Sequence, residues 1–523
     1  MNNDSGKSIS FWMNTESIPP YEPLDHDLTT DVCIVGAGIA GLTTAYLLLS
    51  EGKSVTIVED GPLAGGETAR TTAHLASALD DRFEILEKIH GEKGVKLAYE
   101  SHKSAIDKIE EIIRKENIDC DFSRVSGYLF NPEGNKVIDL EKELEAAKRA
   151  GFTEAEIVNS APLFSFETGP CIKYPNQGQF HVLKYILGLV INITIKGGNI
   201  FTYTRAVSVE DGNNPKVVTD RGFTISAKSV VVATNSPIND LVTMHTKQAP
   251  YRTYVIGALI PKGSFPKILL WDTPDPYHYI RIQENIEGFD QEYDLLIVGG
   301  EDHKTGQESN PESHFEKLIE WARRHFPLIK DIPYKWSGQV LEPVDSLAFL
   351  GRNPGDENVY IITGDSGHGM THTTIGAMLI TDLIMKRSNE WEFLYNPSRI
   401  SLSSTKEFVK ENFNVAAQYM DWFKGSEVNN VDEIASGTGA VMRKGLKKLA
   451  VYKDLKGNTH VCSAVCTHLG GIVRWNDVEK SWDCPCHGSR FDAYGIVLNG
   501  PSKENLEQSD QIMNYRDLIM KKF

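Results

Sequence analysis

The chain has 523 residues, a formal net charge of −17, 41% hydrophobic residues and seven cysteines. This length predicts three or four structural units with more than one core, and so acidic a chain argues against nucleic-acid binding. The cysteines lack the spacing of a disulfide framework, and neither a signal peptide nor an apolar stretch of about 20 residues is evident, so we expect a cytoplasmic protein without a membrane span.

A strand, a glycine-rich turn and a helix form the first recognisable unit. The apolar run 31–35 predicts a short strand, G-A-G-I-A-G follows at 36–41, and the Ala- and Leu-rich run 42–50 predicts a helix. A second strand is predicted at 54–58. A G-x-G-x-x-G motif between a strand and a helix, with an acidic residue about twenty positions on, is the fingerprint of a dinucleotide site.

Each residue of this motif has a physical role in holding a dinucleotide. Gly36 permits the tight turn, Gly38 lets the backbone approach a pyrophosphate, and Gly41 lets the helix pack against the strand. The helix N-terminus then faces the phosphates. Glu59 is expected to bind ribose hydroxyls and to disfavour a 2′-phosphate. No second unit of this kind occurs in the sequence, which argues against a separate NAD(P)H domain.

The middle of the chain is predicted to contain both helices and strands. A charged helix is predicted at about 83–115, and another at about 182–196 after a turn near Gly178. A further helix is expected to begin near Thr371. The predicted strands of this region lie at 199–210, 216–218 and 230–233.

Several of these segments resemble those of the D-amino-acid oxidase/glycine oxidase superfamily of FAD enzymes. G-G-E-T-A-R-T-T-A-H at 65–74 resembles its flavin-facing loop, S-V-V-V-A-T-N at 229–235 a strand near the flavin, and G-D-S-G-H-G-M-T at 364–371 the closing flavin motif. The resemblance covers about residues 30–385 and implies FAD as cofactor. Beyond the glycine motif and Glu59, the cofactor-binding residues that it implies are Arg70, Thr71, Thr72, His74, Val207, Ala233, Gly364, Gly369, Met370 and Thr371.

The resemblance also implies how the first 400 residues are divided. We expect an α/β FAD-binding Rossmann-like domain with an interleaved α+β substrate domain. The FAD-binding part is expected at about 27–80, 150–240 and 335–390. The substrate domain is expected at about 85–150 and 245–335.

The implied reaction is oxidation of a C–N bond. Arg281 lies on the strand that contacts substrate in these enzymes, where an arginine can clamp a carboxylate with two hydrogen bonds; the alternative is a structural arginine. His278, Tyr279 and His368 are further catalytic candidates, against the alternative of buried histidines with satisfied hydrogen bonds. His74 is also a candidate for covalent attachment of the flavin.

Two short stretches near the C-terminus carry metal-ligating residues. C-T-H-L-G-G spans 466–471 and C-P-C-H-G-S spans 484–489. The spacing alone is compatible with a Cys2His2 zinc site and with a 2Fe-2S cluster in which one iron takes two Cys and the other two His. The flanking residues resemble the cluster-binding loops of Rieske proteins, and Gly500-Pro501 resembles their third loop. The ligands that this resemblance implies are Cys466, His468, Cys484 and His487.

One departure of the C-terminal segment from respiratory Rieske proteins concerns a disulfide. In those proteins a disulfide joins the last position of the first loop to the middle Cys of the second. Gly471 occupies the first position here, so Cys486 is expected to have no disulfide partner. We expect a small all-β Rieske domain at 434–523 and a linker at 401–433. The expected docking anchors of the linker are Phe408, Phe413, Tyr419 and Trp422.

These features together predict an FAD-dependent oxidoreductase. We expect it to oxidise a small amine or amino-acid-like substrate, with electrons relayed from reduced FAD to the Rieske cluster and on to an external one-electron carrier. One alternative is an oxygen-using amine oxidase with a structural or redox-sensing Rieske domain. The other is reverse flow, from a ferredoxin through the cluster to the flavin.

Overall fold

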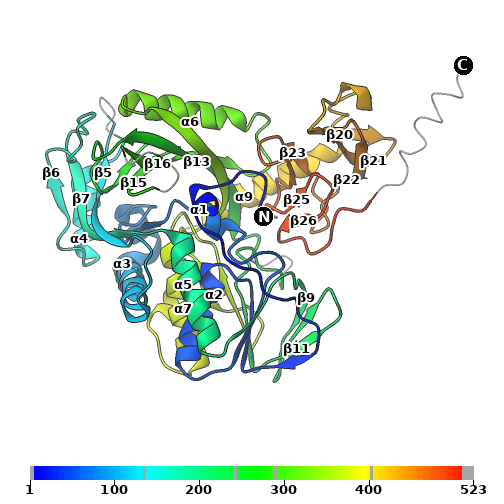
Figure 1. Ribbon diagram of the computed structural model, residues 1–523, viewed down its shortest axis with the longest axis horizontal. Helices are drawn as coiled ribbons and strands as arrows, with labels where there is room; N and C mark the ends of the chain where they lie inside the picture. The colour runs from blue at the N-terminus through cyan, green and yellow to red at the C-terminus, as the bar shows by residue number, and fades with distance from the viewer. Residues whose placement is uncertain are drawn as a thin grey trace, which may run out of the picture.

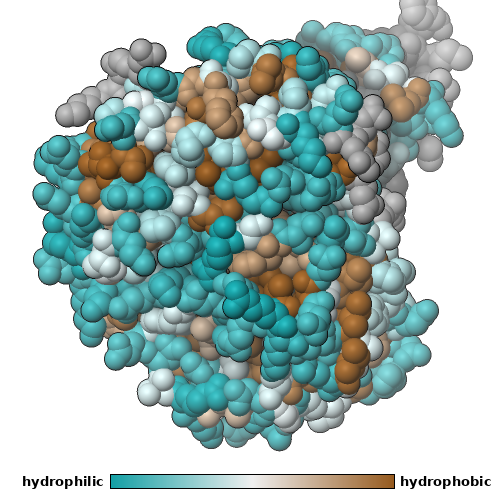
Figure 2. Space-filling model, turned by 60° about the vertical axis from the view of Figure 1, so that its left-hand side comes forward, coloured by the Kyte–Doolittle hydropathy of each residue, from teal (hydrophilic) through white to brown (hydrophobic). Residues whose placement is uncertain are grey.

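The computed structural model describes residues 5–132, 137–239, 244–286, 289, 292–400 and 405–508. Residues 401–404 of the expected linker and 509–523 of the expected Rieske domain lie outside them. Figure 1 shows a large α/β body with a smaller β unit, drawn in orange to red, against one side of it. The face in Figure 2 is mainly hydrophilic, with separate hydrophobic patches. No helix in the described part of the chain is long and apolar enough to cross a membrane.

A six-stranded sheet forms the core of the dinucleotide-binding part. Its short apolar strands are buried on both faces, as is usual for parallel sheets. The strands run parallel except for β18, which is antiparallel at one edge. Across the sheet the order is β18 (Phe349–Arg352), β19 (Val359–Thr363), β12 (Ser229–Val232), β2 (Val32–Val35), β3 (Val55–Val58) and β8 (Asn199–Phe201).

Both faces of this sheet are covered. Helices α2 (Ile39–Ser50), α5 (Val182–Ile195) and α7 (Gly369–Ile384) lie together on one side (Figure 1). On the other side Val217 and Ile225 of a small sheet join β2 and β12 in one apolar cluster. The order of that small sheet is β1 (Leu28–Thr29), β11 (Thr224–Ser226), β10 (Lys216–Thr219) and β9 (Ala206–Glu210).

A larger, mostly antiparallel sheet forms the second part of the body. Helix α6 (Glu312–His325) packs on its strands β13 and β16. Helices α3 (Phe83–Glu116) and α4 (Leu140–Arg149) pack against each other. The order of the sheet is β17 (Asp331–Pro343), β13 (Gln248–Pro261), β16 (Tyr293–Lys304), β15 (His278–Gln283), β14 (Leu269–Asp272), β5 (Ser123–Phe130), β7 (Cys171–Gln179) and β4 (His74–Leu75), with β6 (Glu156–Val158) paired to β7.

The large sheet takes in segments that the sequence analysis assigned elsewhere. Strands β6 and β7 fall within 150–240, which was expected in the FAD-binding part, but β7 pairs antiparallel with β5 of the large sheet. Strand β17 likewise continues past 335 in this sheet, paired with β13. The sequence predicted a turn near Gly178, but Gly178 lies inside β7, whose Pro175 and Asn176 also obscure its strand pattern. Such a pattern does not say which strand will be its hydrogen-bonding partner.

The C-terminal unit is all-β, as expected. Two small sheets share a core that contains Trp482 and Phe491. The first is β20 (Thr438–Lys444), β21 (Lys447–Lys453) and β22 (Thr459–Ser463). The second is β23 (Arg474–Asn476), β24 (Ser481–Asp483), β25 (Arg490–Asp492) and β26 (Val497–Asn499).

Short helices bring the chain to this unit, and two of the four expected anchors dock on it. Tyr419 Oη donates to Leu469 O at 2.7 Å, and Trp422 Nε1 donates to Gly470 O at 2.9 Å. Phe413 instead is 76% exposed and Phe408 39% exposed. The connecting helices are α8 (Trp391–Tyr395), α9 (Thr405–Gln418), η2 (Tyr419–Trp422) and η3 (Val431–Glu433). At the other end of the chain lie α1 (Phe11–Thr15) and η1 (Glu67–Arg70).

One buried carboxylate joins the C-terminal unit to the body. Glu479 Oε1 lies 3.2 Å from Arg252 Nη2 and 3.6 Å from Arg70 Nη1, and all three side chains are fully buried. Ser8 Oγ and Ser337 Oγ both donate to the same carboxylate. A buried ion pair with additional hydrogen bonds is costly to break, because one charge would be left without a partner.

The first prediction concerns this contact. Glu479→Gln leaves two buried arginines without their counter-charge, so we expect a loss of about 3 kcal/mol and a clearly lower midpoint of thermal unfolding. Asp477→Asn, which removes the partly exposed pair with Lys480, should cost less than about 1 kcal/mol. Equal midpoints for the two variants would contradict this account.

The same carboxylate predicts a pH dependence. Burial opposes its charge, but Arg70, Arg252 and Arg490 lower the pKa of Glu479 to about 2 from an ordinary value of 4.5. Its contribution is therefore complete above about pH 4.5 and is lost as the pH falls toward 2. The difference in thermal midpoint between the wild type and Glu479→Gln should shrink over that interval.

Candidate functional site

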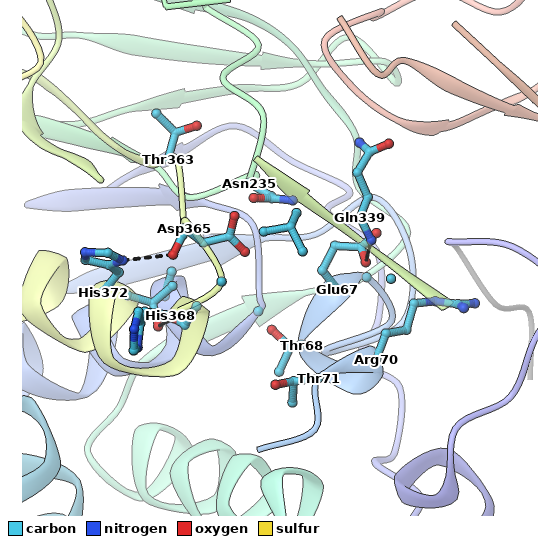
Figure 3. A pocket seen from close by; sticks show the side chains of 18 of the residues that line it. Glu67, Thr68, Arg70, Thr71, Asn235, Gln339, Thr363, Asp365, His368 and His372 are labelled. Carbon is cyan, nitrogen blue, oxygen red and sulfur yellow. Dashed lines mark hydrogen bonds between the residues drawn. The ribbon is translucent and has the colours of Figure 1, made fainter. Parts of the chain in front are cut away.

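A cavity of about 710 Å³ lies between the two parts of the body and the C-terminal unit. This volume is within the usual range of ligand sites. Its walls come from the glycine-rich turn, the flavin-facing loop predicted at 65–74, the large sheet, the start of α7 and residues 497–500 and 502–503. Figure 3 shows Thr68 and Thr71 on one side of it and His368 and His372, from the region of α7, on another.

The glycine-rich turn has the geometry that the motif predicts. Gly36 has φ +106°, where an L-residue is strained, and a Cβ on it would lie 2.5 Å from Ala233 O. A Cβ on Gly41 would lie 1.9 Å from Gly36 O, so only glycine lets α2 pack this closely on β2. Gly38 lines the cavity at the N-cap of α2. Glu59 lines it too, and its Oε2 accepts from Ala37 N at 2.5 Å.

Most of the remaining cofactor candidates also lie at the cavity. The residues among its lining are Arg70, Thr71, Thr72, His74, Ala233, Gly369 and Met370. Val207, Gly364 and Thr371 are not among the lining residues, although their neighbours Ala206, Thr363, Asp365 and His372 are. Gly364 instead serves the turn after β19, since it has φ +75° and a Cβ on it would lie 2.8 Å from Pro343 Cγ.

His74 lies in a tight local environment. Its Nδ1 is 2.9 Å from Thr72 Oγ1, and its ring centroid is 5.7 Å from that of Tyr279. Burial, with Arg281 as a further cause, lowers the pKa of His74 to about 3, so the ring is neutral at ordinary pH. This places a neutral imidazole at the edge of the flavin-facing loop.

The four catalytic candidates separate into two pairs. Tyr279 and His368 line the cavity, and His368 Nε2 accepts from the backbone N–H of Asp80 at 2.8 Å. His278 is not among the lining residues. Its Nδ1 lies 2.8 Å from Asp272 Oδ2, and its ring stacks on Trp321 at 4.1 Å.

Arg281 does not reach the cavity. It is fully buried, and its Nη1 donates to the carbonyls of Thr72, Ala73 and Phe180 at 3.0–3.2 Å. Its guanidinium therefore fixes the backbone of the flavin-facing loop, which corresponds to the structural alternative rather than the substrate clamp. The reason is local: on β15, Tyr279 lines the cavity and Arg281, two residues on, meets this loop instead.

The sequence analysis missed the acidic residues at the cavity. Asp80, Asp81 and Asp302 line it, together with Asp275 and Glu342. These residues come from separate loops and strands, so no sequence motif brings them together. Only the Asp80-Asp81 pair stands out in the sequence, a few positions after the flavin-facing loop.

The four expected metal ligands meet in the C-terminal unit. Cys466 and Cys484 are 2% exposed, and the rings of His468 and His487 have centroids 5.0 Å apart. His487 Nδ1 is buried without a hydrogen-bond partner, so its lone pair is available to coordinate an iron atom. Burial, followed by His468 and His245, lowers the pKa of His487 to about 3, so its ring is neutral, as metal ligation requires.

This donor set fits a 2Fe-2S cluster, with two thiols for one iron and two imidazoles for the other. In the described part of the chain no three His, Cys, Asp or Glu side chains surround a single point. A two-iron cluster takes only two protein ligands for each iron, because sulfide supplies the rest. Ser502 Oγ lies 3.3 Å from Cys466 Sγ, where it can donate a hydrogen bond to the sulfur.

Cys486, which was expected to have no disulfide partner, is a free thiol in the structure. All seven cysteines are free. A Cβ on Gly471 would lie 2.6 Å from Cys486 Sγ, so the two positions are neighbours in space and only the residue type prevents a bond.

The metal site and the cavity share one segment of the chain, which begins with β26. The segment 497–500 and 502–503 lines the cavity, and Ser502 contacts the sulfur of Cys466. His245, from the segment before β13, makes a second contact between the body and the metal site. Its ring centroid lies 4.9 Å from that of His468 and 6.2 Å from that of His487. The imidazole edge of the metal site thus contacts the body through His245.

Comparisons with known proteins agree with this geometry. The family model "FAD dependent oxidoreductase" matches residues 31–383, and the model "Rieske [2Fe-2S] domain" matches residues 424–510. The chain is 31% identical over 504 residues to YhfW of Bacillus subtilis (strain 168), which is named as a Rieske 2Fe-2S iron-sulfur protein, and this match covers 96% of the chain and 97% of the relative. These matches identify FAD and a 2Fe-2S cluster as the cofactors and decide against zinc.

Two more distant relatives cover the flavin part alone. Gamma-glutamylputrescine oxidoreductase of Escherichia coli (strain K12) is 24% identical over 396 residues, which is 72% of this chain and 88% of that protein. The crystal structure of glycine oxidase from Geobacillus kaustophilus superimposes with a TM-score of 0.59 at 16% identity, covering 72% of this chain and all of that one. The second match shows a shared fold.

The second prediction tests the metal ligands. Cys466→Ser should abolish the cluster, because a hydroxyl is a poor iron ligand, and so remove iron and the visible absorbance of the C-terminal unit. Cys462→Ser changes a buried thiol whose Sγ lies 3.8 Å from Ala450 O, and should retain iron. The measurement is iron content for each purified variant, and iron retained in Cys466→Ser would refute the ligand set.

The third prediction tests the glycine-rich turn. A methyl group at Gly41 has no space against Gly36 O, so Gly41→Ala should yield protein with little bound FAD. Gly425→Ala adds the same methyl group in open space and should leave the flavin content unchanged. Flavin released from each variant by heat is measured by absorbance. A full complement of FAD in Gly41→Ala would show that FAD binding does not depend on the close contact between Gly41 and Gly36 O.

Proposed function

Since the chain belongs to the FAD dependent oxidoreductase family and carries a Rieske 2Fe-2S domain, we propose that it oxidises an amine or amino-acid-like substrate and relays the electrons through the cluster. The final acceptor is an external one-electron carrier. Oxidation of a C–N bond to an imine removes two electrons and two protons. FAD supplies a two-electron acceptor in the cavity, and the cluster is a one-electron group.

The segment 497–503 of the Rieske unit, which begins with β26, is the observation that carries this proposal. Residues 497–500 and 502–503 form part of the wall of the flavin cavity, and Ser502 of the same loop contacts the cluster ligand Cys466. A separate structural or sensing domain has no need for a wall shared with the flavin site. Electrons that leave the cavity along this loop remain within one chain, at high effective concentration.

The residues that line the cavity at the large sheet are compatible with oxidation of a C–N bond that needs no acid–base pair. Tyr279 and the neutral His74 lie together there, and Tyr279 Oη is 2.6 Å from Thr253 Oγ1. Their part is to shape the pocket and exclude water, because the cofactor carries the electron transfer. The similarity to gamma-glutamylputrescine oxidoreductase adds support for an amine substrate.

The fourth prediction tests the relay. Amines and amino acids are screened anaerobically for bleaching of the flavin absorbance, and the reduced cluster is then sought by electron paramagnetic resonance. A substrate should produce both signals in the wild type, whereas Cys484→Ser should show bleaching alone. Flavin bleached beside a cluster that stays oxidised would favour the oxygen-using alternative, and a cluster reduced only by added ferredoxin would favour reverse flow.

A further inference from the structure

The loop that holds Cys484 and His487 packs directly against the body. Gly488 has φ +76°, and a Cβ on it would lie 2.6 Å from Pro250 Cβ of β13. A Cβ on Gly306, just after β16, would lie 2.9 Å from Asp483 O. Glycine at these two positions therefore lets the backbone of the ligand loop approach the large sheet closely.

Gln339 of β17 joins this ligand loop to the flavin cavity. The residue lines the cavity, and its Nε2 donates to Gly488 O at 3.1 Å. Gly488 directly follows the expected ligand His487. The backbone N–H of Gln339 donates to Oε2 of Glu67, a further lining residue, at 2.7 Å, and Figure 3 shows the two residues close together. Gln339 thus belongs to the cavity wall and also contacts a ligand loop of the metal site.

The amide group of Gln339 is held in a single orientation. Thr305 Oγ1 donates to its Oε1 at 3.1 Å. Gly488 O can only accept, so the NH2 group must face it and Oε1 is left for the hydroxyl. Gln339 is 2% exposed and Thr305 is fully buried. Turning this buried amide would leave both partners without a hydrogen bond, which is costly.

This arrangement provides a bonded route between the cavity and the metal site. The route runs from the cavity wall along the side chain of Gln339, across one hydrogen bond to Gly488, and along the backbone to His487. An electron tunnels more readily along covalent bonds and hydrogen bonds than across a gap of the same length. A fixed amide at this point therefore favours electron exchange between the two sites.

The other contact between the cavity and the metal site leads to a different ligand. Ser502, on the segment 497–503, contacts the sulfur of Cys466, whereas Gln339 leads to His487. Two thiolates give their iron two negative charges, and two neutral imidazoles give theirs none. An added electron is therefore favoured at the iron with the imidazoles, which is the side that the contact through Gln339 reaches.

We infer that Gln339 is the bridging residue of the relay and carries the electron between the flavin cavity and His487 through its hydrogen bond to Gly488 O. This inference rests on the proposed function and deepens it. In each transfer the reduced flavin loses one electron and one ferric iron of the cluster becomes ferrous. Gln339 is neither oxidised nor reduced, because its amide only provides the contact.

The test measures exchange within the protein that carries FAD and the cluster, and it needs no substrate. A laser flash on soluble deazariboflavin with EDTA, without oxygen, delivers one electron to the protein, and exchange between flavin and cluster follows as a first-order change in absorbance. We expect Gln339→Met, which keeps the length of the side chain and removes its donor, to slow this change at least tenfold.

Gln307→Met is the matched control. Gln307 Nε2 also donates to the ligand loop, at Pro485 O over 3.3 Å, but the residue is not among those that line the cavity. This variant removes a comparable hydrogen bond without interrupting the route, so it should exchange electrons at the wild-type rate. Equal slowing in the two variants would show that docking of the loop controls the rate, and would overturn the inference.

A second variant tests the orientation of the amide. Thr305→Val removes the hydroxyl that fixes Oε1 of Gln339, and we expect a smaller slowing of the same change. Iron content, FAD content and the midpoint potential of the cluster should equal those of the wild type in all three variants, because no ligand is altered. A merely structural Gln339 would instead change these quantities or the thermal midpoint and leave the first-order rate as it is.

The outcomes separate the inference from the proposed function. A first-order change in the wild type that is equally fast in Gln339→Met would overturn the inference and leave the relay to the segment 497–503. The absence of any first-order change in the wild type would contradict both the relay and the inference. Thr305→Val carries the test if Gln339→Met loses a cofactor, and a wild-type rate in it would then overturn the inference.

Discussion

A single buried carboxylate sets the relation between the two cofactor sites. Glu479 belongs to the Rieske unit, and its charge is balanced by Arg70 and Arg252 of the body. Arg70 also ends the flavin-facing helical turn η1 and donates to the carbonyls of Gly6, Ser8 and Ser337. The ion network that holds the Rieske unit therefore also shapes the wall of the flavin cavity, so neither site can move without disturbing the other.

This docking has consequences for the cluster. The ring of His245 of the body lies against the imidazole edge, and the segment 497–503 lies between Cys466 and the cavity. Both contacts join the Rieske unit directly to the body. A fixed geometry of this kind suits an electron relay within the chain better than a tethered domain that must find its partner by diffusion.

Local patterns of the sequence predicted the parts of the site that depend on local geometry. The turn at Gly36 and Gly41 follows from backbone packing alone. The four cluster ligands lie on two short sequence motifs, whose spacing and flanking residues together predicted them. The pairing of strands distant in the sequence could not be predicted in this way. Strand β7 pairs with β5 of the large sheet, and no local pattern indicates that partner.

The side chains that line the cavity at the large sheet were even harder to predict from the sequence. Arg281 has the residue type of a carboxylate clamp, but its bonds to Thr72, Ala73 and Phe180 depend on loops distant in the sequence. Asp80 and Asp302 are ordinary acidic residues until the fold gathers them at one cavity. The acidic lining of the cavity is therefore a property of the tertiary structure.

The central claim is that electrons pass from flavin to cluster inside one chain. The most direct measurement is the rate of cluster reduction after rapid anaerobic mixing with a reducing substrate, recorded over a wide range of protein concentrations. A docked relay predicts a first-order rate that is independent of protein concentration. A rate that rises in proportion to protein concentration would show transfer between molecules and contradict the account.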